Sequence, residues 1–451
     1  MLRALTCALL AAGCLAAPAA AAPPPIKHVF IIWLENENYD STFGPGTKIP
    51  YLASELPKQG ALLTEYYGTG HASLDNYITV VSGQPPNPVT QADCQIYQEF
   101  QPGTLDPEGV ALGQGCVYPP TVKTIADQLE AKGLRWKGYM DDMKTACRHP
   151  ALNAQDDTQS AEVGDQYATR HNPFAYFHSI IDRSTCADND VPLDRLPYDL
   201  ASAATTANYN FITPDLCDDG HDKPCVDGRP GGLESANTFL QEWVPKITSS
   251  PAYKKDGMLV IGFDEAGNDT TSCCGEPIGP NTPNNGGPSP GSGGGKVGAV
   301  VLSRFIRGGT VSAVPYNHYS MLRTSEDIFG LPHLAYAARP DLAPFGDDVF
   351  TARDNVAPPP AGPPRIRVRG VPKHGCAGDF RARVRITATR LTSVRAKLDG
   401  KLVYRKARKR FSIRVRRAQL DRGMHRLVVR AAQRNGRTAR HVNHFRTCRR
   451  G

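Results

Sequence analysis

The chain has 451 residues, of which 40% are hydrophobic and 21% are charged. This composition excludes a fibrous protein and a wholly disordered one, because it supplies enough apolar residues for a packed core. The length allows one large domain and one smaller domain.

The N-terminus has the order of features that is typical of a secretory signal peptide. Arg3 precedes an apolar stretch over residues 4–17, and a run of small residues ends at Ala22. The apolar stretch is shorter than the roughly 20 residues that a membrane-spanning helix needs. We therefore predict a signal peptide over residues 1–22 and a secreted, cell-surface or periplasmic protein. Lipidation of Cys14 is the less favoured alternative, because the residues before it match a lipobox only in part.

The first predicted element is a buried strand over residues 28–34, which are apolar after the first position. This strand runs directly into Glu35 and Asn36. In a parallel sheet, ligands bind where strands end at their carboxyl side. Glu35 and Asn36 are therefore candidate site residues.

A glycine-rich turn over residues 68–72 leads into a predicted helix that begins at Ser73 and ends before Gly83. A helix N-terminus presents unpaired N–H groups and the positive end of the helix dipole, and both favour a phosphate oxygen. A serine hydroxyl at this place becomes a nucleophile when a metal ion ionises it. The competing interpretation is that Ser73 only caps the helix, a common role of serine.

Of the 12 cysteines, Cys7 and Cys14 lie in the signal peptide, which leaves an even number in the mature chain. Such a number fits disulfides that form in an oxidising compartment. A cysteine metal site is disfavoured, because the chain has no CxxC pair. The expected pairs are Cys94–Cys116, Cys147–Cys186, Cys217–Cys225 and Cys376–Cys448, and Cys273 is adjacent to Cys274.

Helical patterns and apolar strands alternate along the first three quarters of the chain. This alternation predicts an α/β fold in which a largely parallel sheet is covered by helices on both faces. The tract over residues 279–295 is rich in Gly, Pro and Asn and is expected to be a surface loop. The expected helices are 122–132, 233–247 and 319–329, and the expected strands after the first are 210–213, 258–263 and 297–302.

Three histidines are candidates for proton transfer or substrate binding. His221 lies in an acid-rich loop between Cys217 and Cys225, where neighbouring aspartates fix the tautomer of an imidazole and raise its basicity. His318 is expected to start a helix just after a strand, a placement that suits a general acid. His171 lies before an Asn-Pro turn and is a further candidate.

The strand predicted over residues 258–263 repeats the pattern of the first strand, because it runs directly into Asp264 and Glu265. Oxygen ligands from two neighbouring strand ends suit a hard divalent cation, which relieves the repulsion among clustered carboxylates. Mg²⁺, Ca²⁺ or Mn²⁺ fits these oxygens better than Zn²⁺ does. The competing interpretation is that the acids only end the strands and face solvent.

The C-terminal sequence is strongly basic. From Arg365 to the end it contains 28 Lys and Arg against three acids, a net charge of +25, so the rest of the chain carries −17. A proline-rich segment, residues 357–364, precedes it and is expected to be a semi-rigid linker. We therefore predict one domain over residues 23–356 and a basic domain over residues 365–451.

The basic domain is predicted to be a small antiparallel β-sandwich. Apolar and polar residues alternate with period two at residues 365–369, 383–386 and 411–416, which is typical of half-buried strands. Asp399-Gly400 and Asn435-Gly436 are dipeptides that favour two-residue hairpin turns. The outward face of the sandwich is expected to be mostly arginine.

Five segments stand in order along the chain: ENENYD with FG at residues 35–44, HASLDNY at 71–77, FITPDLCDDGHD at 211–222, FDE at 263–265 and YNHYS at 316–320. Together they resemble the bacterial phosphoesterase family of acid phosphatases and non-specific phospholipases C, a branch of the alkaline phosphatase superfamily. The resemblance spans about residues 26–344, does not reach the basic domain, and implies an alkaline-phosphatase-like sheet flanked by helices.

The resemblance also implies a role for each matching residue. The chain departs from the pattern at Asp75, where relatives often carry proline, and at Glu265, where some carry aspartate. Neither departure removes an oxygen ligand. The metal ligands that it implies are Glu35, Asn36, Ser73, Asp264 and Glu265, and the phosphate-pocket residues are His71, Asn76, His221 and His318.

These observations predict a secreted, metal-dependent phosphoesterase that hydrolyses phosphomonoesters. Ser73 is the expected nucleophile, His221 or His318 would protonate the leaving oxygen, and His71, Asn76 and His171 would bind the substrate.

Two other functions remain open. The first is a phospholipase C-type phosphodiesterase that acts on phospholipid head groups, with the basic domain against anionic lipid. The second is a non-catalytic surface protein that binds polyanions, which leaves the acidic strand ends unexplained. In an enzyme, the basic domain would attach the protein to an anionic membrane, a cell-wall polymer or another polyanion.

Overall fold

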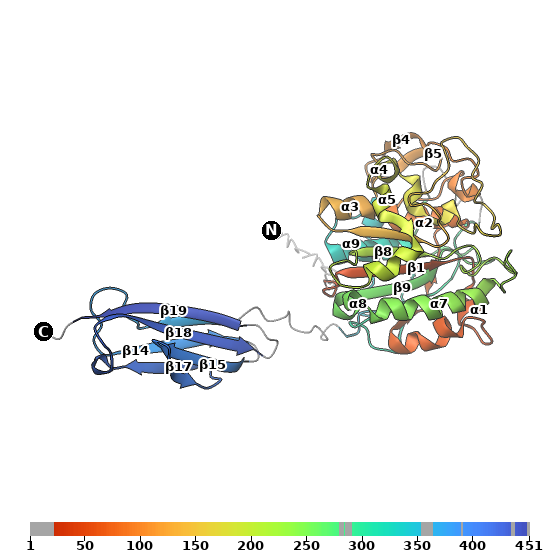
Figure 1. Ribbon diagram of the computed structural model, residues 1–451. Helices are drawn as coiled ribbons and strands as arrows, with labels where there is room; N and C mark the ends of the chain where they lie inside the picture. The colour runs from red at the N-terminus through yellow and green to blue at the C-terminus, as the bar shows by residue number, and fades with distance from the viewer. Residues whose placement is uncertain are drawn as a thin grey trace, which may run out of the picture. The chain divides into compact units, whose positions relative to one another are not determined.

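The computed structural model of the chain describes residues 22–278, 284, 291–352, 364–388, 391–433 and 438–448. The chain divides into two compact units, Met1–Asn355 and Val356–Gly451 (Figure 1). The predicted signal peptide up to residue 21, with the candidate lipidation site Cys14, lies outside the described residues. So do the linker before Pro364, the Asn435-Gly436 turn and most of the loop over residues 279–295.

Unit 1 is built on an eight-stranded sheet with the order β11-β2-β10-β9-β1-β8-β6-β7. Seven strands run in one direction and β10 runs against both of its neighbours. The largely parallel sheet is therefore confirmed, and the strand expected near residue 300 is its antiparallel member. The strands are β1 His28–Leu34, β2 Ala61–Leu63, β6 Trp136–Met140, β7 Asp190–Pro192, β8 Tyr209–Thr213, β9 Gly257–Phe263, β10 Ala299–Ser303 and β11 Thr310–Ser312.

The central strands β1 and β9 are buried along their whole length, which explains their continuous apolar sequences. Figure 1 shows α2, α3 and α9 on one side of these strands and α7 and α8 on the other. This α/β arrangement places the core of unit 1 on both faces of the sheet. The helices are α2 Ser73–Ser82, α3 Ile125–Ala131, α7 Gly232–Ser249, α8 Pro251–Asp256 and α9 His318–Phe329.

The helix ends follow from local side chains. α3 begins later than predicted because Thr124 is its N-cap and forms a capping box with Asp127. α2 ends where Gly83 adopts a left-handed conformation with φ 70°. In the described part of the chain, no helix is both long and apolar enough to cross a membrane.

Shorter elements complete unit 1. Among the described residues, five disulfides are formed, and they include all four expected pairs and a bridge between the adjacent Cys273 and Cys274. The short elements are α1 Tyr39–Phe43, β3 Tyr66–Tyr67, β4 Gln101–Leu105, β5 Ala111–Gln114, the 3-10 turn η4 Thr169–His171, α4 His178–Ile181, α5 Cys186–Asn189, α6 Leu196–Asp199 and β12 Tyr316–Asn317.

Unit 2 is an antiparallel β-sandwich, as predicted. A three-stranded sheet, β13-β14-β17, and a four-stranded sheet, β16-β15-β18-β19, share one apolar core. The Asp399-Gly400 hairpin is formed, and both of its residues have positive φ, 45° and 84°. The strands are β13 Arg365–Arg369, β14 Phe380–Thr387, β15 Leu391–Leu398, β16 Lys401–Arg405, β17 Arg410–Val415, β18 Gly423–Gln433 and β19 Thr438–Thr447.

Candidate active site

The two acidic strand ends lie side by side. β1 pairs with β9 in parallel register up to Leu34 and Phe263, so Glu35 and Asp264 leave the sheet at the same edge. Asn36 has a left-handed φ of 49°, which asparagine tolerates better than most residues. Its backbone N–H donates to Asp264 Oδ1 over 3.0 Å. The strand ends therefore form one buried site, and Glu35 and Asp264 do not face solvent.

Ser73 is the first residue of α2 and lies over this edge. Ala72 is the N-cap of the helix, so Ser73 does not cap it. The Ser73 hydroxyl instead donates to Glu35 Oε2 over 2.7 Å. The next N–H of the helix, that of Leu74, donates to Asp93 Oδ1. The structure thus brings the predicted nucleophile into contact with a predicted metal ligand.

Asp219 also lies in the cluster, although it is not among the residues predicted for the site. It follows β8, which pairs with the other side of β1, and its carbonyl accepts the N–H of Glu35 over 2.9 Å. Asp219 Oδ1 accepts the backbone N–H of His221, and Oδ2 lies 3.7 Å from His171 Nδ1. The sequence signal that predicts a role for Asp219 is an acidic residue after β8, the strand next to β1.

Burial of these carboxyl groups raises their pKa values. Burial and then the charge of Asp264 hold the pKa of Glu35 well above its usual range. Burial and the charge of Glu35 do the same to Asp219, and burial and Asp264 do the same to Glu265. Burial raises the pKa of Asp264 to about 7. These buried carboxyl groups are therefore more stable when they bind protons, or when a bound cation compensates their negative charge.

Four buried oxygen atoms of this cluster have no hydrogen-bond partner: Glu35 Oε1, Asn36 Oδ1, Asp219 Oδ2 and Asp264 Oδ2. Burial of an unsatisfied polar atom costs about 1–3 kcal/mol. Carboxylate and amide oxygens are the donors that Mg²⁺, Ca²⁺ and Mn²⁺ prefer. The donor set thus fits a divalent cation.

His171 is buried beside Glu35 and does not lie at the surface of the site. Its ring is buried, stacks on Tyr77 at 5.3 Å between centroids, and places Nε2 3.4 Å from Glu35 Oε1. Burial, and then the charge of Arg170, hold the pKa of His171 well below its usual range. The neutral ring is therefore a candidate ligand or orienting group for the cluster.

The two candidate proton donors differ in placement. His318 is fully buried; its Nε2 donates to the Asp264 carbonyl over 2.6 Å, and its Nδ1 accepts from Tyr66 Oη over 3.1 Å. Burial lowers the pKa of His318 to about 3. His221, by contrast, has a side chain that is 51% exposed, and its charge contributes to the low pKa of His171. His221 is the better placed of the two to exchange protons with solvent.

Asn76 and His71 belong to the turn before α2. The Asn76 amide accepts from the N–H groups of Thr69 and Gly70, and it donates to the Ala72 carbonyl and to Glu265 Oε2. Its polar atoms are occupied in holding the turn and Glu265 in place. His71 is half-buried, and its Nδ1 has no partner. A phosphate contact therefore stays a prediction for both residues and is better supported for His71.

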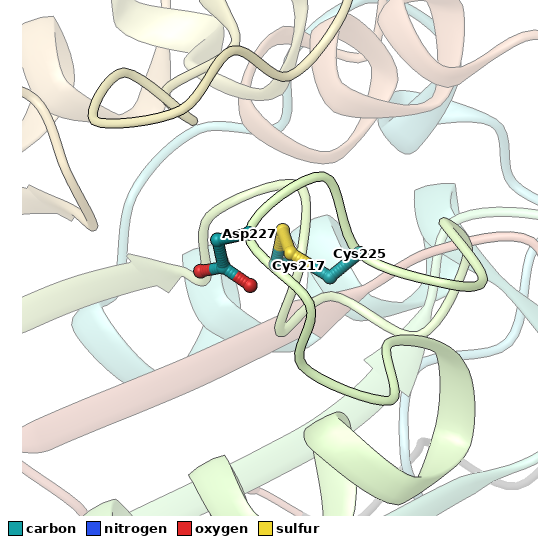
Figure 2. A group of neighbouring side chains, drawn as sticks. All are labelled: Cys217, Cys225 and Asp227. Atoms are coloured by element: carbon teal, nitrogen blue, oxygen red, sulfur yellow. A yellow bond between two sulfur atoms is a disulfide. The ribbon is translucent and has the colours of Figure 1, made fainter.

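Away from the sheet edge, two groups of three side chains in the described chain lie close enough to share an ion. The first joins Asp227 to Cys217 and Cys225, but Figure 2 shows the two sulfur atoms bonded to each other, so no thiolate is present. The second consists of Asp141, Asp215 and Asp218, where Arg229 already pairs with the last two. Neither group resembles the oxygen cluster at the sheet edge.

Comparison with known proteins places these features in a family. The model of the Phosphoesterase family matches residues 45–332, more than half of the chain. A probable acid phosphatase of Kluyveromyces lactis is 25% identical over 68% of this chain and 59% of its own length. An acid phosphatase of Aspergillus fumigatus is 23% identical over 68% of this chain and 55% of its own. The chain thus spans little more than half the length of these relatives.

Two further proteins are similar over most of the chain. A phosphatidylinositol-3-phosphatase of Mycobacterium tuberculosis is 22% identical over 71% of this chain and 82% of its own length. A solved structure of an alkaline phosphatase superfamily protein from Vibrio parahaemolyticus aligns with a TM-score of 0.42 and 13% identity, over 81% of this chain and 78% of that one. By the match of the family model, and as its five sequence segments indicated, the chain belongs to the phosphoesterase family.

Proposed function

We propose that unit 1 hydrolyses phosphomonoesters outside the cytoplasm, with a divalent cation as cofactor and Ser73 as nucleophile. The observation that carries the proposal is the hydrogen bond from Ser73 Oγ to Glu35, at the N-terminus of α2 and beside oxygens that lack partners. The acid phosphatases among the relatives support a phosphate ester as substrate. The disulfides support an oxidising compartment.

The proposal gives a task to each group. Glu35, Asn36, Asp264 and Asp219 would hold the cation, which when bound supplies positive charge that lowers the energy of the transferring phosphoryl group. The bond to Glu35 orients the Ser73 hydroxyl within the site. The Ser73 proton passes along this bond to Glu35 Oε2, and the serine oxygen forms a bond to phosphorus as the bond to the leaving oxygen breaks. Water later cleaves the phosphoserine, which releases phosphate and restores the hydroxyl.

The leaving oxygen needs a proton, and we propose the exposed His221 as its donor, because His318 is buried and both of its ring nitrogens have partners. His318 instead orients Asp264 through the carbonyl of that residue. A general acid matters most for a poor leaving group. His221→Gln should therefore slow the hydrolysis of an alkyl phosphate far more than that of p-nitrophenyl phosphate. An equal effect on both substrates would contradict the general-acid role of His221.

One substrate panel tests the proposal. The enzyme would be assayed with p-nitrophenyl phosphate, bis(p-nitrophenyl) phosphate and phosphatidylcholine, in EDTA and then with Mg²⁺, Ca²⁺, Mn²⁺ or Zn²⁺ added. We expect p-nitrophenyl phosphate, the monoester, to be hydrolysed when a cation is present and not in EDTA. Preferred cleavage of the diester or of phosphatidylcholine would support the phospholipase C function instead. Absence of all hydrolysis with every cation would leave the polyanion-binding protein as the better account.

A phosphoinositide belongs in the same panel. The mycobacterial relative, of which this chain covers 82%, is a phosphatidylinositol-3-phosphatase. Its name favours a phosphomonoester on a lipid head group as a second candidate substrate for this chain. Release of inorganic phosphate from phosphatidylinositol 3-phosphate at a higher kcat/KM than from p-nitrophenyl phosphate would establish it.

A further inference from the structure

Four arginines stand in one line across the four-stranded sheet of unit 2. Arg405 is paired directly with Arg395, Arg395 with Arg430, and Arg430 with Arg440. Directly opposite residues of an antiparallel pair have Cβ atoms about 4.5–5.5 Å apart. The line, which we call the arginine row, therefore spans about 15 Å from one edge of the sheet to the other.

The arginine row faces away from the core. All four side chains are exposed, while the strand neighbours of Arg395 and Arg430 are buried in the core. Within the described residues, none of the four forms an ion pair with an acid. Asp399 bonds to His425, and Asp379 accepts the backbone N–H of Arg417.

Such an arrangement does not stabilise the fold. Like charges directly opposite each other on a sheet are destabilising. Solvation of a sheet face requires polar side chains but not guanidinium groups in every strand. The row is therefore better explained by a ligand whose negative charges repeat along a line.

A hollow of about 510 Å³ lies along this row. Arg395, Arg430 and Arg440 line it together with the hydroxyl-bearing Ser393 and Thr438. Short side chains, such as Ala432 and Ala439, complete its lining and leave room between the guanidinium groups. Guanidinium binds phosphate through two parallel N–H donors, and a hydroxyl adds a further donor.

We propose that the arginine row and its hollow bind a linear polymer of polyols joined by phosphodiester bonds, such as poly(glycerol phosphate). Each phosphate would sit between neighbouring guanidinium groups, and the flexible polyol would lie along the hollow. Binding of this polymer would hold the phosphoesterase unit at a surface rich in phosphate polymers.

The distribution of charge argues against a membrane. The three-stranded sheet carries its own line of exposed arginines, because Arg367 is paired with Arg385 and Arg385 with Arg410. A planar bilayer contacts one face of a sandwich at a time and leaves the other charged face uncompensated. A soluble polymer reaches both faces.

The side chains also argue against nucleic acid. Proteins that bind single strands stack bases on aromatic rings. The large apolar side chains that are exposed in the described part of unit 2 are Leu402, Val403 and Met424, none of which is aromatic. A duplex holds its phosphates on a rigid rod, which does not fit into a hollow of about 510 Å³.

The test measures binding of poly(glycerol phosphate) to the full chain in 150 mM NaCl. The double variant Arg395→Ser with Arg430→Ser removes the centre of the row. The control, Arg416→Ser with Arg422→Ser, removes the same charge from exposed positions that lie outside both lines of arginines. We expect at least tenfold weaker binding for the first variant and less than threefold for the control. The slope of log K against log salt should become shallower by about 1.4, because two phosphate contacts are lost.

A second pair of variants separates charge from geometry. Arg395→Lys with Arg430→Lys keeps the charge but loses the two-pronged contact, so binding should weaken at least threefold. No variant should have a lower melting temperature, because removal of opposed arginines relieves repulsion, and all should keep full hydrolysis of p-nitrophenyl phosphate. Equal losses in the Arg395/Arg430 and Arg416/Arg422 serine variants would overturn the proposal. The proposal would also be overturned if the Arg395/Arg430 serine variant lost binding to phosphatidylglycerol vesicles or to duplex DNA by the same factor as binding to poly(glycerol phosphate).

Discussion

The two units treat like charges in opposite ways. Unit 1 buries Glu35, Asp219, Asp264 and Glu265 together, where water cannot screen them. Unit 2 spreads its arginines over both outer faces of a sandwich, where solvent and salt screen each one. Buried charges of one sign need a proton or a counter-ion at a fixed place, whereas exposed ones attract mobile counter-ions. The first arrangement suits chemistry at one atom, and the second suits attachment to a polymer.

The sharpest test of the buried cluster is its nucleophile. Ser73→Ala should lower kcat by at least three orders of magnitude, because it deletes the attacking oxygen. The melting temperature should change little, since Ala72 and not Ser73 caps α2. Steady-state kinetics and thermal denaturation measure the two effects. Ser82→Ala, at the other end of the same helix, is the matched control and should retain activity; near-normal activity of Ser73→Ala would refute the assignment.

Removal of the metal should affect unit 1 and not unit 2. We expect EDTA to lower activity at least a hundredfold and to lower the unfolding temperature of unit 1 only, because the cation would bind the folded cluster alone. A cation at 100 times its Kd contributes about 2.7 kcal/mol to the stability of the form that binds it. Differential scanning calorimetry resolves the transitions. Asp264→Asn should mimic EDTA, and an unchanged transition of unit 1 in EDTA would contradict the proposed cofactor.

A buried carboxyl group outside the cluster should keep its proton. Glu326 in α9 is buried, and burial raises its pKa to about 9. The folded state then holds a proton that the unfolded state releases above pH 5, so the free energy of unfolding should fall as pH rises from 5 to 9. Glu326→Gln should remove on the order of 2 kcal/mol of this fall. Exposed Glu108→Gln is the control, and equal pH profiles for wild type and Glu326→Gln would contradict the expectation.

The smallest expected effect is that of salt on unit 2. Raising NaCl from 20 mM to 500 mM should increase its melting temperature by a few degrees, because the repulsion between paired arginines such as Arg367 and Arg385 is screened. The transition of unit 1 should move less, since its like charges are buried. Calorimetry at fixed pH measures both. A decrease for unit 2 would mean that its arginines form stabilising ion pairs.

Much of the fold follows from local patterns. The apolar run before Glu35 forms β1, the glycine at position 83 ends α2, and the period-two alternation at residues 365–369 forms β13. Each depends on residues within a few positions, so the sequence predicts it well. Strand order, in contrast, depends on distant segments, and the antiparallel direction of β10 was not predicted.

The site divides in the same way. The sequence by itself determined which acids end the two central strands and that Ser73 begins a helix, because strand ends and helix starts are local features. Only the tertiary structure decided that Asp219 joins Glu35, that His318 is enclosed while His221 is exposed, and that four arginines from four strands form one row. Burial and cross-strand register depend on how segments far apart in the chain pack, and no local pattern encodes those distances.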